Sequence, residues 1–244
     1  MSRASYDFHT HSCLSPCADN DSTPSDLAGM ALLNGINVMA LTDHNSAKNC
    51  PAFFKAAEHY GIIPIAGMEL TTAEDIHMIC LFEELDGALS FEEYLDKFKT
   101  KIKNRTDIFG DQLILDSGDN VVGFEENYLP IATALTIEAA AEAVVKYGGV
   151  CYPAHIDRQS NGIIAVLGAM PEYPEFPCVE LNNSRNREEF TVKYGLSDKR
   201  ILISSDAHRL SDLREDNDFI EIISDIRDTS SVKREIFEIL RGLK

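Results

Sequence analysis

The sequence predicts an α/β fold in which strands and helices alternate around one sheet or barrel. Helical stretches separate many of the apolar runs, as in units that pair strands with helices. A chain of 244 residues with 44% hydrophobic content can bury one sizeable core, so we expect residues 1–244 to form a single domain. The apolar runs that fit strands lie at 4–9, 36–42, 62–70, 76–82, 149–154, 177–181, 200–205 and 218–223.

Three helices are predicted from the signals at their ends. The helix near 24–34 follows Thr23, a capping residue that precedes a proline, and Gly35 ends it. A second helix near 51–60 also stops at a glycine. A last helix at about 231–241 carries apolar residues at helical spacing.

Residues 85–135 break the alternation of strand and helix. A polar, charged helix is expected at about 90–104. Within 112–123, Ser-Gly-Asp-Asn lies between two short apolar runs and predicts a β-hairpin. We expect this segment to be an insertion near the mouth of the barrel, where it would shape specificity.

Composition restricts the partners and the location of the chain. A formal charge of −18 repels phosphate backbones, which favours a small phosphorylated substrate and makes extended nucleic acid an unexpected partner. No apolar run is long enough to cross a membrane and the N-terminus lacks a signal-peptide core, so we expect a cytoplasmic protein with reduced cysteines. The sequence does not indicate an oligomeric state.

Six of the seven histidines follow or begin predicted strands, and His59, inside a helix, is taken as structural. Asp7, His9 and His11 alternate along the end of the first strand, so they face the same way. The other four strand-end histidines are His44, His77, His155 and His208. Active sites of α/β folds are built at strand ends, which makes this coincidence informative.

Glu69 ends a predicted strand, and only a short turn separates it from the next strand at 76–82. So short a connection predicts an antiparallel return, which would place His77 beside Glu69. Imidazoles and carboxylates together predict a site for divalent cations. A structural zinc site of His9, His11, Cys13 and Cys17 is the alternative, but it would leave the four other strand-end histidines unexplained.

These motifs together resemble the PHP family, named for polymerase and histidinol phosphatase. The matching motifs are Asp-x-His-x-His at 7–11, Thr-Asp-His at 42–44, Glu69, His77, Pro-Ala-His at 153–155 and Ser-Asp-Ala-His at 205–208. The resemblance implies a distorted, TIM-like (β/α)7 barrel with a trinuclear metal site at the C-terminal face.

The resemblance also implies how the ligands are shared. One metal would be held by His9, His11, Glu69 and Asp206, and a second by Glu69, His77 and His155. The third would take His44, His208 and an acidic residue from the loop after the first strand. That loop lacks the histidine found in some members, so Asp19 is expected there, with Asp21 as the alternative.

Other polar residues near these motifs receive supporting roles. Asp7 and Asp43 are expected to orient ligand imidazoles through the second ring nitrogen. Arg158 is predicted to contact phosphate, with a surface ion pair to Asp157 as the alternative, and Arg185 and Arg187 are weaker candidates.

The predicted function is that of a metal-dependent phosphoesterase, a hydrolase that uses two to three ions of Mn, Fe or Zn. Glu69, as the bridging ligand, and Arg158 are the expected catalytic residues. The substrate would be a nucleotide, a short oligonucleotide or a sugar or amino-alcohol phosphate, attacked by a metal-activated water. The alternatives are a histidinol-phosphate phosphatase and a non-catalytic metal-binding regulatory module.

Overall fold

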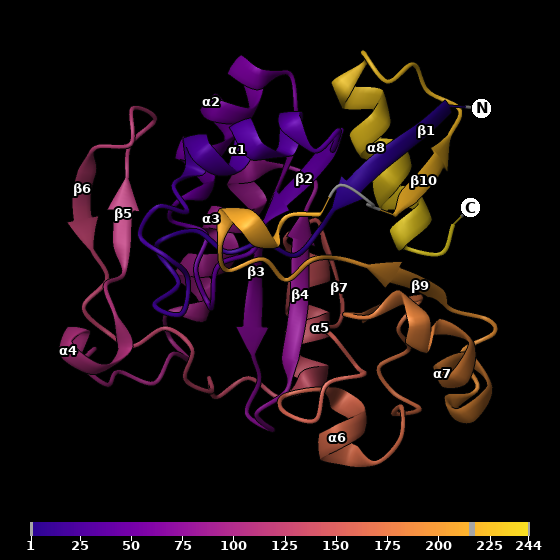
Figure 1. The fold of residues 1–244 in the computed structure, drawn as a ribbon. Coiled ribbons are helices and arrows are strands. Elements are labelled where there is room, and N and C mark those ends of the chain that lie inside the picture. Colours follow the sequence, from indigo (N-terminus) through magenta and orange to yellow (C-terminus); the bar gives the residue numbers. More distant parts are fainter. Residues whose placement is uncertain (1, 215–217, 244) are drawn as a thin grey trace.

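The computed structural model describes residues 2–214 and 218–243. A mixed sheet in the strand order β10-β1-β2-β3-β4-β7 forms its centre (Figure 1). β1, β2 and β3 are parallel, β4 is antiparallel to both of its neighbours, and β10 is antiparallel to β1. The bounds are β1 Ser2–Asp7, β2 Val38–Leu41, β3 Ile63–Thr71, β4 His77–Phe82, β7 Gly149–Pro153 and β10 Phe219–Ile222.

A separate parallel pair, β8 (Cys178–Leu181) and β9 (Arg200–Ile203), lies between β7 and β1. Beyond β7, the Ile156 N–H donates to the carbonyl of Glu180 at 2.9 Å. Beyond β1, Thr10 forms an isolated parallel bridge with Ala207. The α/β fold is therefore confirmed, while a closed (β/α)7 barrel stays a prediction.

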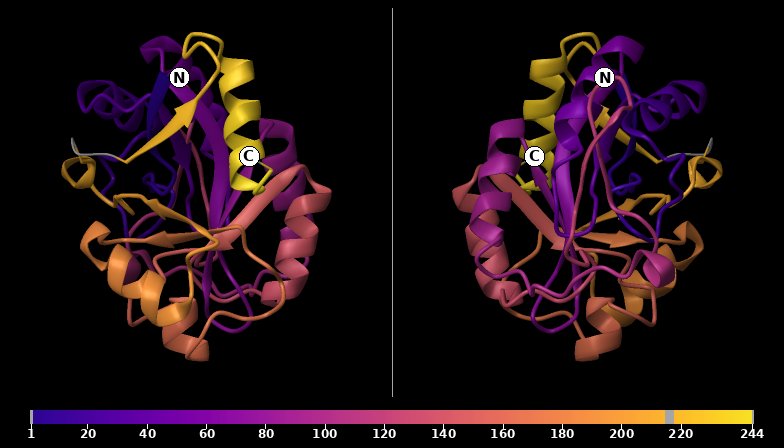
Figure 2. Two further views of the ribbon diagram at one scale, coloured as in Figure 1. Left: turned by 90° about the vertical axis from the view of Figure 1, so that its right-hand side faces the viewer. Right: turned by 90° about the vertical axis from the view of Figure 1, so that its left-hand side faces the viewer.

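Helices surround the strands on several sides (Figure 2). The predicted N-cap of α1 is present, since Thr23 Oγ1 accepts from the Asp26 N–H at 3.1 Å. The longer helices are α1 Pro24–Leu33, α2 Cys50–Tyr60, α3 Leu85–Leu95, α5 Ile137–Lys146, α7 Arg187–Tyr194 and α8 Thr229–Leu240. The shorter ones are α4 Thr106–Phe109, α6 Ile163–Leu167, η1 Ser184–Asn186 and η2 Leu210–Asp212. No helix of the described part is long and apolar enough to cross a membrane.

Two apolar cores lie on opposite faces of the strands. In the outer core, Leu27 of α1 and Phe53 of α2 pack with Met68 of β3. In the inner core, Phe237 of α8 packs with Ile65 of β3. Since alternate residues of a strand share a face, Glu69 lies on the same side of β3 as Ile65, further along the strand. The inner face therefore changes from apolar to polar toward the end of β3.

The segment 85–135 contains the predicted hairpin but a shorter helix than expected. The hairpin consists of β5 (Leu113–Leu115) and β6 (Val121–Phe124). The helix α3 ends at Leu95, and the helix expected as far as residue 104 is wrong beyond that point. The backbone after α3 pairs with 126–134 instead, for example through the Tyr128 N–H to the carbonyl of Ile102. Whether 85–135 is an insertion stays a prediction.

Candidate metal centre

Five imidazoles surround the buried carboxylate of Glu69, four of them within 3.3 Å and the fifth, His9, at 3.4 Å. Its Oε1 lies 2.7 Å from His77 Nδ1 and 3.0 Å from His155 Nε2. Its Oε2 lies 3.0 Å from His44 Nδ1 and 3.3 Å from His11 Nε2. The predicted meeting of Glu69 with His77 is present because the two residues flank the β3–β4 turn, where Thr71 pairs with His77. One carboxylate thus faces ligand-type nitrogens with each of its oxygens.

His9 and His11 meet at a second carboxylate, that of Asp206. Their Nε2 atoms are 3.1 Å apart and lie 3.2 Å and 3.3 Å, respectively, from Asp206 Oδ1. His9 Nε2 is also 3.4 Å from Glu69 Oε1. Two imidazole nitrogens and two carboxylates therefore point at one small volume, as the ligands of a cation do.

Three groups of side chains among the described residues have ligand atoms close enough to share an ion. Within each group these atoms lie within 4.8 Å of one another. Glu69, His11 and His44 each belong to two groups, so neighbouring ions would share them. The groups are His9, His11, Glu69 and Asp206; His44, Glu69 and His77; and His11, His44 and His208.

The first group contains the residues predicted for the first metal, whereas the other two differ from the predicted sets. The second group includes His44 rather than His155, although His155 still contacts Glu69. The third group contains His11 in place of an acidic residue. The assignment of each ligand to a particular ion stays a prediction.

The structure does not bring Asp19 or Asp21 into these groups. The Asp19 side chain is 57% exposed and its Oδ2 lies 3.5 Å from Arg209 Nε. The loop places only the Asp19 backbone beside the site, where its N–H donates to the carbonyl of His208 at 2.9 Å. The carboxylate consequently points to solvent.

The sulfur atoms of Cys13 and Cys17 belong to none of these groups. Burial raises the pKa of the Cys13 thiol to about 12, which disfavours the thiolate that zinc requires, and Cys17 is exposed. The structure therefore gives no support to the closed zinc site. All six cysteines are free, in agreement with the expectation of reduced thiols.

Orphaned polar atoms and the charge pattern both fit bound cations. Asp206 Oδ1 and His44 Nδ1 are buried without a hydrogen-bond partner. Burial opposes a charge on His9, but the carboxylates of Asp206, Glu180 and Glu69 outweigh it and hold the pKa of His9 well above its usual value. Burial likewise opposes the charge of Glu69, yet the imidazoles, His77 and His9 foremost, hold its pKa well below the usual value. Of the carboxylates that favour a protonated His9, Asp206 and Glu69 are the ones that would bind a cation.

Glu180, on β8, supports the site but was not predicted. Its Oε1 accepts from His9 Nδ1–H at 2.8 Å and from the His155 N–H at 3.1 Å. This leaves His9 Nε2 as the nitrogen that faces the cluster. An acidic residue inside the otherwise apolar strand candidate 177–181 was the available signal.

Ser15 was also missed, and it holds two ligands. The Ser15 hydroxyl donates to Asp43 Oδ1 at 2.7 Å. Ser15 Oγ therefore accepts from His11 Nδ1–H at 3.1 Å. The backbone N–H of His44 also donates to Ser15 Oγ, at 3.1 Å. A serine in a polar loop carries no sequence signal for this role.

The two predicted orienting aspartates act on the backbone and on serine rather than directly on imidazole. Asp7 Oδ1 accepts from the N–H groups of His9 at 3.3 Å and Ser205 at 3.2 Å. Burial raises the pKa of Asp7 to about 6. Asp43 reaches His11 only through Ser15. Both aspartates thus position the loops that carry ligands.

Arg158 lies at the rim of the cluster. Its Nη1 is 2.6 Å from Asp206 Oδ2, and its side chain is 41% exposed. The expected alternative, an ion pair with Asp157, is absent because the Asp157 carboxylate accepts from the N–H groups of Asn182 and Asn183. A partly exposed guanidinium beside the cluster is suitably placed to contact a phosphate.

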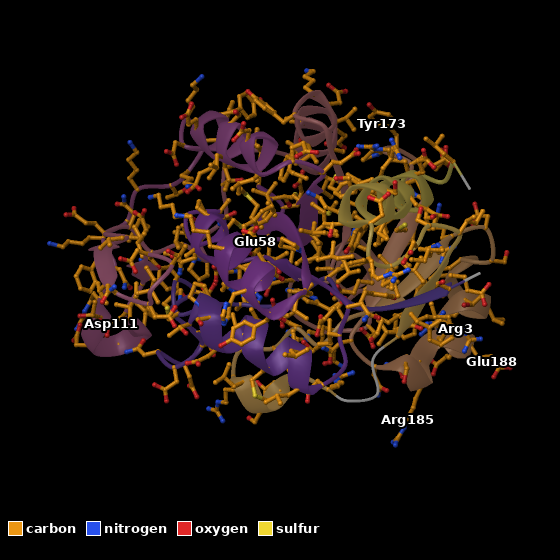
Figure 3. The ribbon with its side chains drawn as sticks, turned by 90° about the horizontal axis from the view of Figure 1, so that it is seen from above. Arg3, Glu58, Asp111, Tyr173, Arg185 and Glu188 are labelled. Atoms are coloured by element: carbon orange, nitrogen blue, oxygen red, sulfur yellow. The ribbon has the colours of Figure 1, made fainter. Side chains whose placement is uncertain are left out.

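The two weaker arginine candidates do not reach the centre. Arg187 Nη2 pairs with Asp218 Oδ2 at 2.7 Å. Arg185 projects outward at the edge of the molecule, at the opposite side from Asp111 (Figure 3).

Three residues of the site have positive backbone φ angles. These are 48° for Asn45, 26° for His155 and 52° for Asp206. Non-glycine residues rarely adopt such angles, which concentrate at functional sites.

Comparisons with known proteins identify relatives of part of the chain. Residues 7–114 match the model of the PHP domain. An error-prone DNA polymerase of Symbiobacterium thermophilum is 40% identical over 74 residues, 30% of this chain and 7% of its own length. A 5'-3' exoribonuclease of Haemophilus influenzae is 35% identical over 79 residues, 31% of this chain and 28% of its own length. The chain therefore spans much less than half the length of either relative.

The fold is similar to that of the lesion-specific endonuclease Q of Pyrococcus furiosus. The TM-score is 0.66 at 17% identity, over 100% of this chain and 57% of the endonuclease. Endonuclease Q in complex with a 27-mer duplex that has an abasic lesion at the active site gives a TM-score of 0.67.

This likeness corrects the prediction that small phosphorylated compounds, and not extended nucleic acid, are the partners. A protein of similar fold binds a DNA duplex, so the exclusion was wrong. The formal charge of −18 is a sum over the whole chain, whereas binding depends on the charges beside the site.

The predicted resemblance to the PHP family is confirmed by the match of residues 7–114 to the PHP domain model.

Proposed function

We propose that this chain is a metal-dependent phosphoesterase, a hydrolase of phosphoric ester bonds that uses two to three ions of Mn, Fe or Zn. The observation that carries the proposal is the position of Glu69, whose two oxygens face different imidazoles of a buried cluster. A carboxylate in this position would hold two cations at a short, defined separation.

Divalent cations bound there would supply an activated water and positive charge toward the phosphoryl oxygens. The chain's own residues would orient the ligand imidazoles and contact the phosphate. Glu180 fixes the orientation of the His9 ring, and Ser15 fixes that of the His11 ring. Arg158, now paired with Asp206, would bind a phosphoryl oxygen from the solvent side.

The substrates we propose are phosphate esters of nucleotides and of nucleic acid. The curated relatives include polymerases and an exoribonuclease, and endonuclease Q shares the fold. A sugar or amino-alcohol phosphate, histidinol phosphate among them, is the second class to be tested.

The test is a hydrolysis panel combined with elemental analysis of the same preparation. The panel would contain bis(p-nitrophenyl) phosphate, p-nitrophenyl phosphate, histidinol phosphate, mononucleotides and single-stranded oligonucleotides. We expect hydrolysis that is abolished by chelation and restored by Mn²⁺. A metal-loaded protein without activity on any member would overturn the proposal and favour the non-catalytic regulatory module.

A further inference from the structure

Residues 97–105 form a local basic segment within an acidic chain. They contain five Lys and Arg residues and no acidic residue, whereas the whole chain has a formal charge of −18. The segment follows α3 and is not helical until α4 begins at Thr106. The basic residues occur at every second position, Lys97, Lys99, Lys101, Lys103 and Arg105. Residues 97–99 turn back onto α3, whereas the stretch around 102–104 pairs with 126–128 and is extended. Lys101 and Lys103 therefore point to the same side.

The basic segment forms one wall of a cavity of about 210 Å³, lined by Lys99, Lys101, Lys48 and Tyr128, among others. Lys48 pairs with Glu125, and Lys99 pairs with Glu92 and Asp96.

Three lysines of the segment form no ion pair within the described residues, and one of them, Lys97, lies over the Tyr94 ring at 5.9 Å from its centroid. Lys101 and Lys103 are exposed and form no ion pair in the described part of the chain. These two ammonium groups are therefore available to an anion from solution.

Exposed apolar side chains occur in the basic segment, in α4 and in the hairpin that follows. Phe109 is 44% exposed, and its ring centroid is 4.5 Å from that of Tyr128. Ile102, in the basic segment itself, is 51% exposed, and Phe124 of the hairpin is 63% exposed. Rings that stand beside cations can stack on the bases of a strand whose phosphates the cations bind.

This region is joined directly to the metal centre. Asn45 follows the ligand candidate His44, and its N–H donates to the carbonyl of Glu69 at 2.9 Å. The Asn45 Nδ2 atom donates to the carbonyls of Leu129 at 2.7 Å and Ile131 at 3.0 Å, and all three residues line the cavity. Asn45, which lines the cavity, is therefore the next residue in the chain after His44 of the cluster.

A second contact joins the two regions on the other side. A Cβ atom on Gly110, which follows α4, would lie 2.8 Å from the carbonyl oxygen of Pro16. Pro16 is the residue after Ser15, which holds His11 and His44.

We propose that this region binds single-stranded nucleic acid and leads one end of it to the metal centre. We call Lys101, Lys103, Phe109 and Tyr128 with the adjoining cavity the strand-binding surface. Unpaired bases are required for stacking on the rings, which favours a single strand over a duplex. The inference rests on the proposed phosphoesterase function and specifies its substrate.

Binding is measured separately from hydrolysis, with chelator present throughout. The probes are fluorescein-labelled single-stranded DNA and RNA of about twelve nucleotides, within the length range that such surfaces cover. We expect anisotropy to show binding to the single strands that weakens as salt is raised. Lys101→Glu with Lys103→Glu should weaken it at least about tenfold and reduce the salt slope by about 1.4. Phe109→Ala should weaken it about tenfold.

The matched controls reverse the charge of two exposed lysines elsewhere, Lys146 of α5 and Lys193 of α7. The helix α7 lies on the other side of the molecule from the hairpin (Figure 1). Lys146→Glu with Lys193→Glu should bind as the wild type does. Thermal unfolding confirms that each variant is folded, and Tyr173→Ala controls for loss of an exposed ring.

Three results would overturn the inference: no effect of the Lys101 and Lys103 reversals, an equal effect of the control reversals, or equal affinity for a matched duplex or inorganic polyphosphate. Hydrolysis of bis(p-nitrophenyl) phosphate by the wild type, assayed with Mn²⁺, tests the proposed function separately. Activity without strand binding would overturn the inference alone, and strand binding without activity would overturn the proposed function.

Discussion

The metal centre and the strand-binding surface are neighbours, but they are built in opposite ways. In the centre, side chains such as His9, Glu69 and Asp206 are at most 2% exposed and depend on one another for their charge states. On the strand-binding surface, Phe109 is 44% exposed, and Lys101 has no ionic partner in the described residues. A buried cluster can be disrupted by one substitution, whereas an exposed surface loses affinity in increments.

The largest effect is expected from Glu69→Gln. An amide would face the imidazoles with one oxygen instead of two, so more than one metal ion should be lost. We expect hydrolysis to fall by more than about a hundredfold, the range for loss of a major electrostatic group in an active site. Elemental analysis and kcat/KM on bis(p-nitrophenyl) phosphate measure the two effects, and full metal content would show that the bridging role is misassigned.

The same variant tests the independence of the two regions. Glu69→Gln should bind a single strand with the affinity of the wild type when chelator is present. The control is Glu58→Gln, because Glu58 is exposed on α2 and belongs to none of the three ligand groups. A loss of strand binding in Glu69→Gln would show that the strand-binding surface depends on the cluster.

A smaller effect is expected from Glu180→Gln. The amide retains the size of the side chain but loses the charge that holds His9 Nδ1–H at 2.8 Å. Loss of such an orienting partner typically weakens metal affinity about tenfold to a hundredfold. Competition against a fluorescent chelator measures the affinity, and an unchanged value would contradict the role given to Glu180.

Arg158→Ala should act on substrate rather than on metal. The partly exposed guanidinium would contribute about tenfold to KM through a charge-assisted hydrogen bond, with a smaller effect on kcat. Arg185→Ala is the control, since Arg185 projects away from the site. A fall in metal content without a change in KM would mean that Arg158 serves only to neutralise Asp206.

The smallest effect on activity is expected from Gly110→Ala. Gly110 has φ 92° and ψ 177°, a region open almost only to glycine, so alanine should lower the free energy of unfolding by about 1–3 kcal/mol. Gly123→Ala, where an added Cβ would find its nearest neighbour at 3.6 Å, is the control. Urea denaturation measures the stability of both variants. Equal stability of the two would contradict both the cost of the positive φ angle at position 110 and the close approach to Pro16.

Most of the fold could be predicted from the sequence because the strands are short apolar runs with clear boundaries. The strand candidates at 62–70 and 177–181 coincide almost entirely with β3 and β8. The helix at 90–104 was wrong beyond α3 because the charges suggested a solvated helix. Their spacing of two residues is that of an extended segment, which pairs with 126–134.

The site was less predictable where a residue acts through the tertiary structure. His9, His11 and Glu69 follow strand ends, which the sequence reveals. Asp19 was chosen for its residue type, but the loop turns its carboxylate toward Arg209. Glu180 contacts His9 across 171 positions of the chain, and its place in an apolar strand candidate marks it as unusual without revealing its partner. Ser15 contacts His11 across 4 positions, and no local pattern marks that contact.

The positive φ angles at Asn45, His155 and Asp206 restrict which residues these positions can accept during evolution. Asparagine, aspartate and histidine tolerate such angles better than other side chains, and β-branched residues tolerate them least. A change from aspartate to glutamate at position 206 would conserve the charge, yet it would replace a residue suited to the backbone with one that is less so. The local backbone therefore selects among chemically equivalent ligands, and homologues that exchange one carboxylate for the other should also differ in the loop that follows β9.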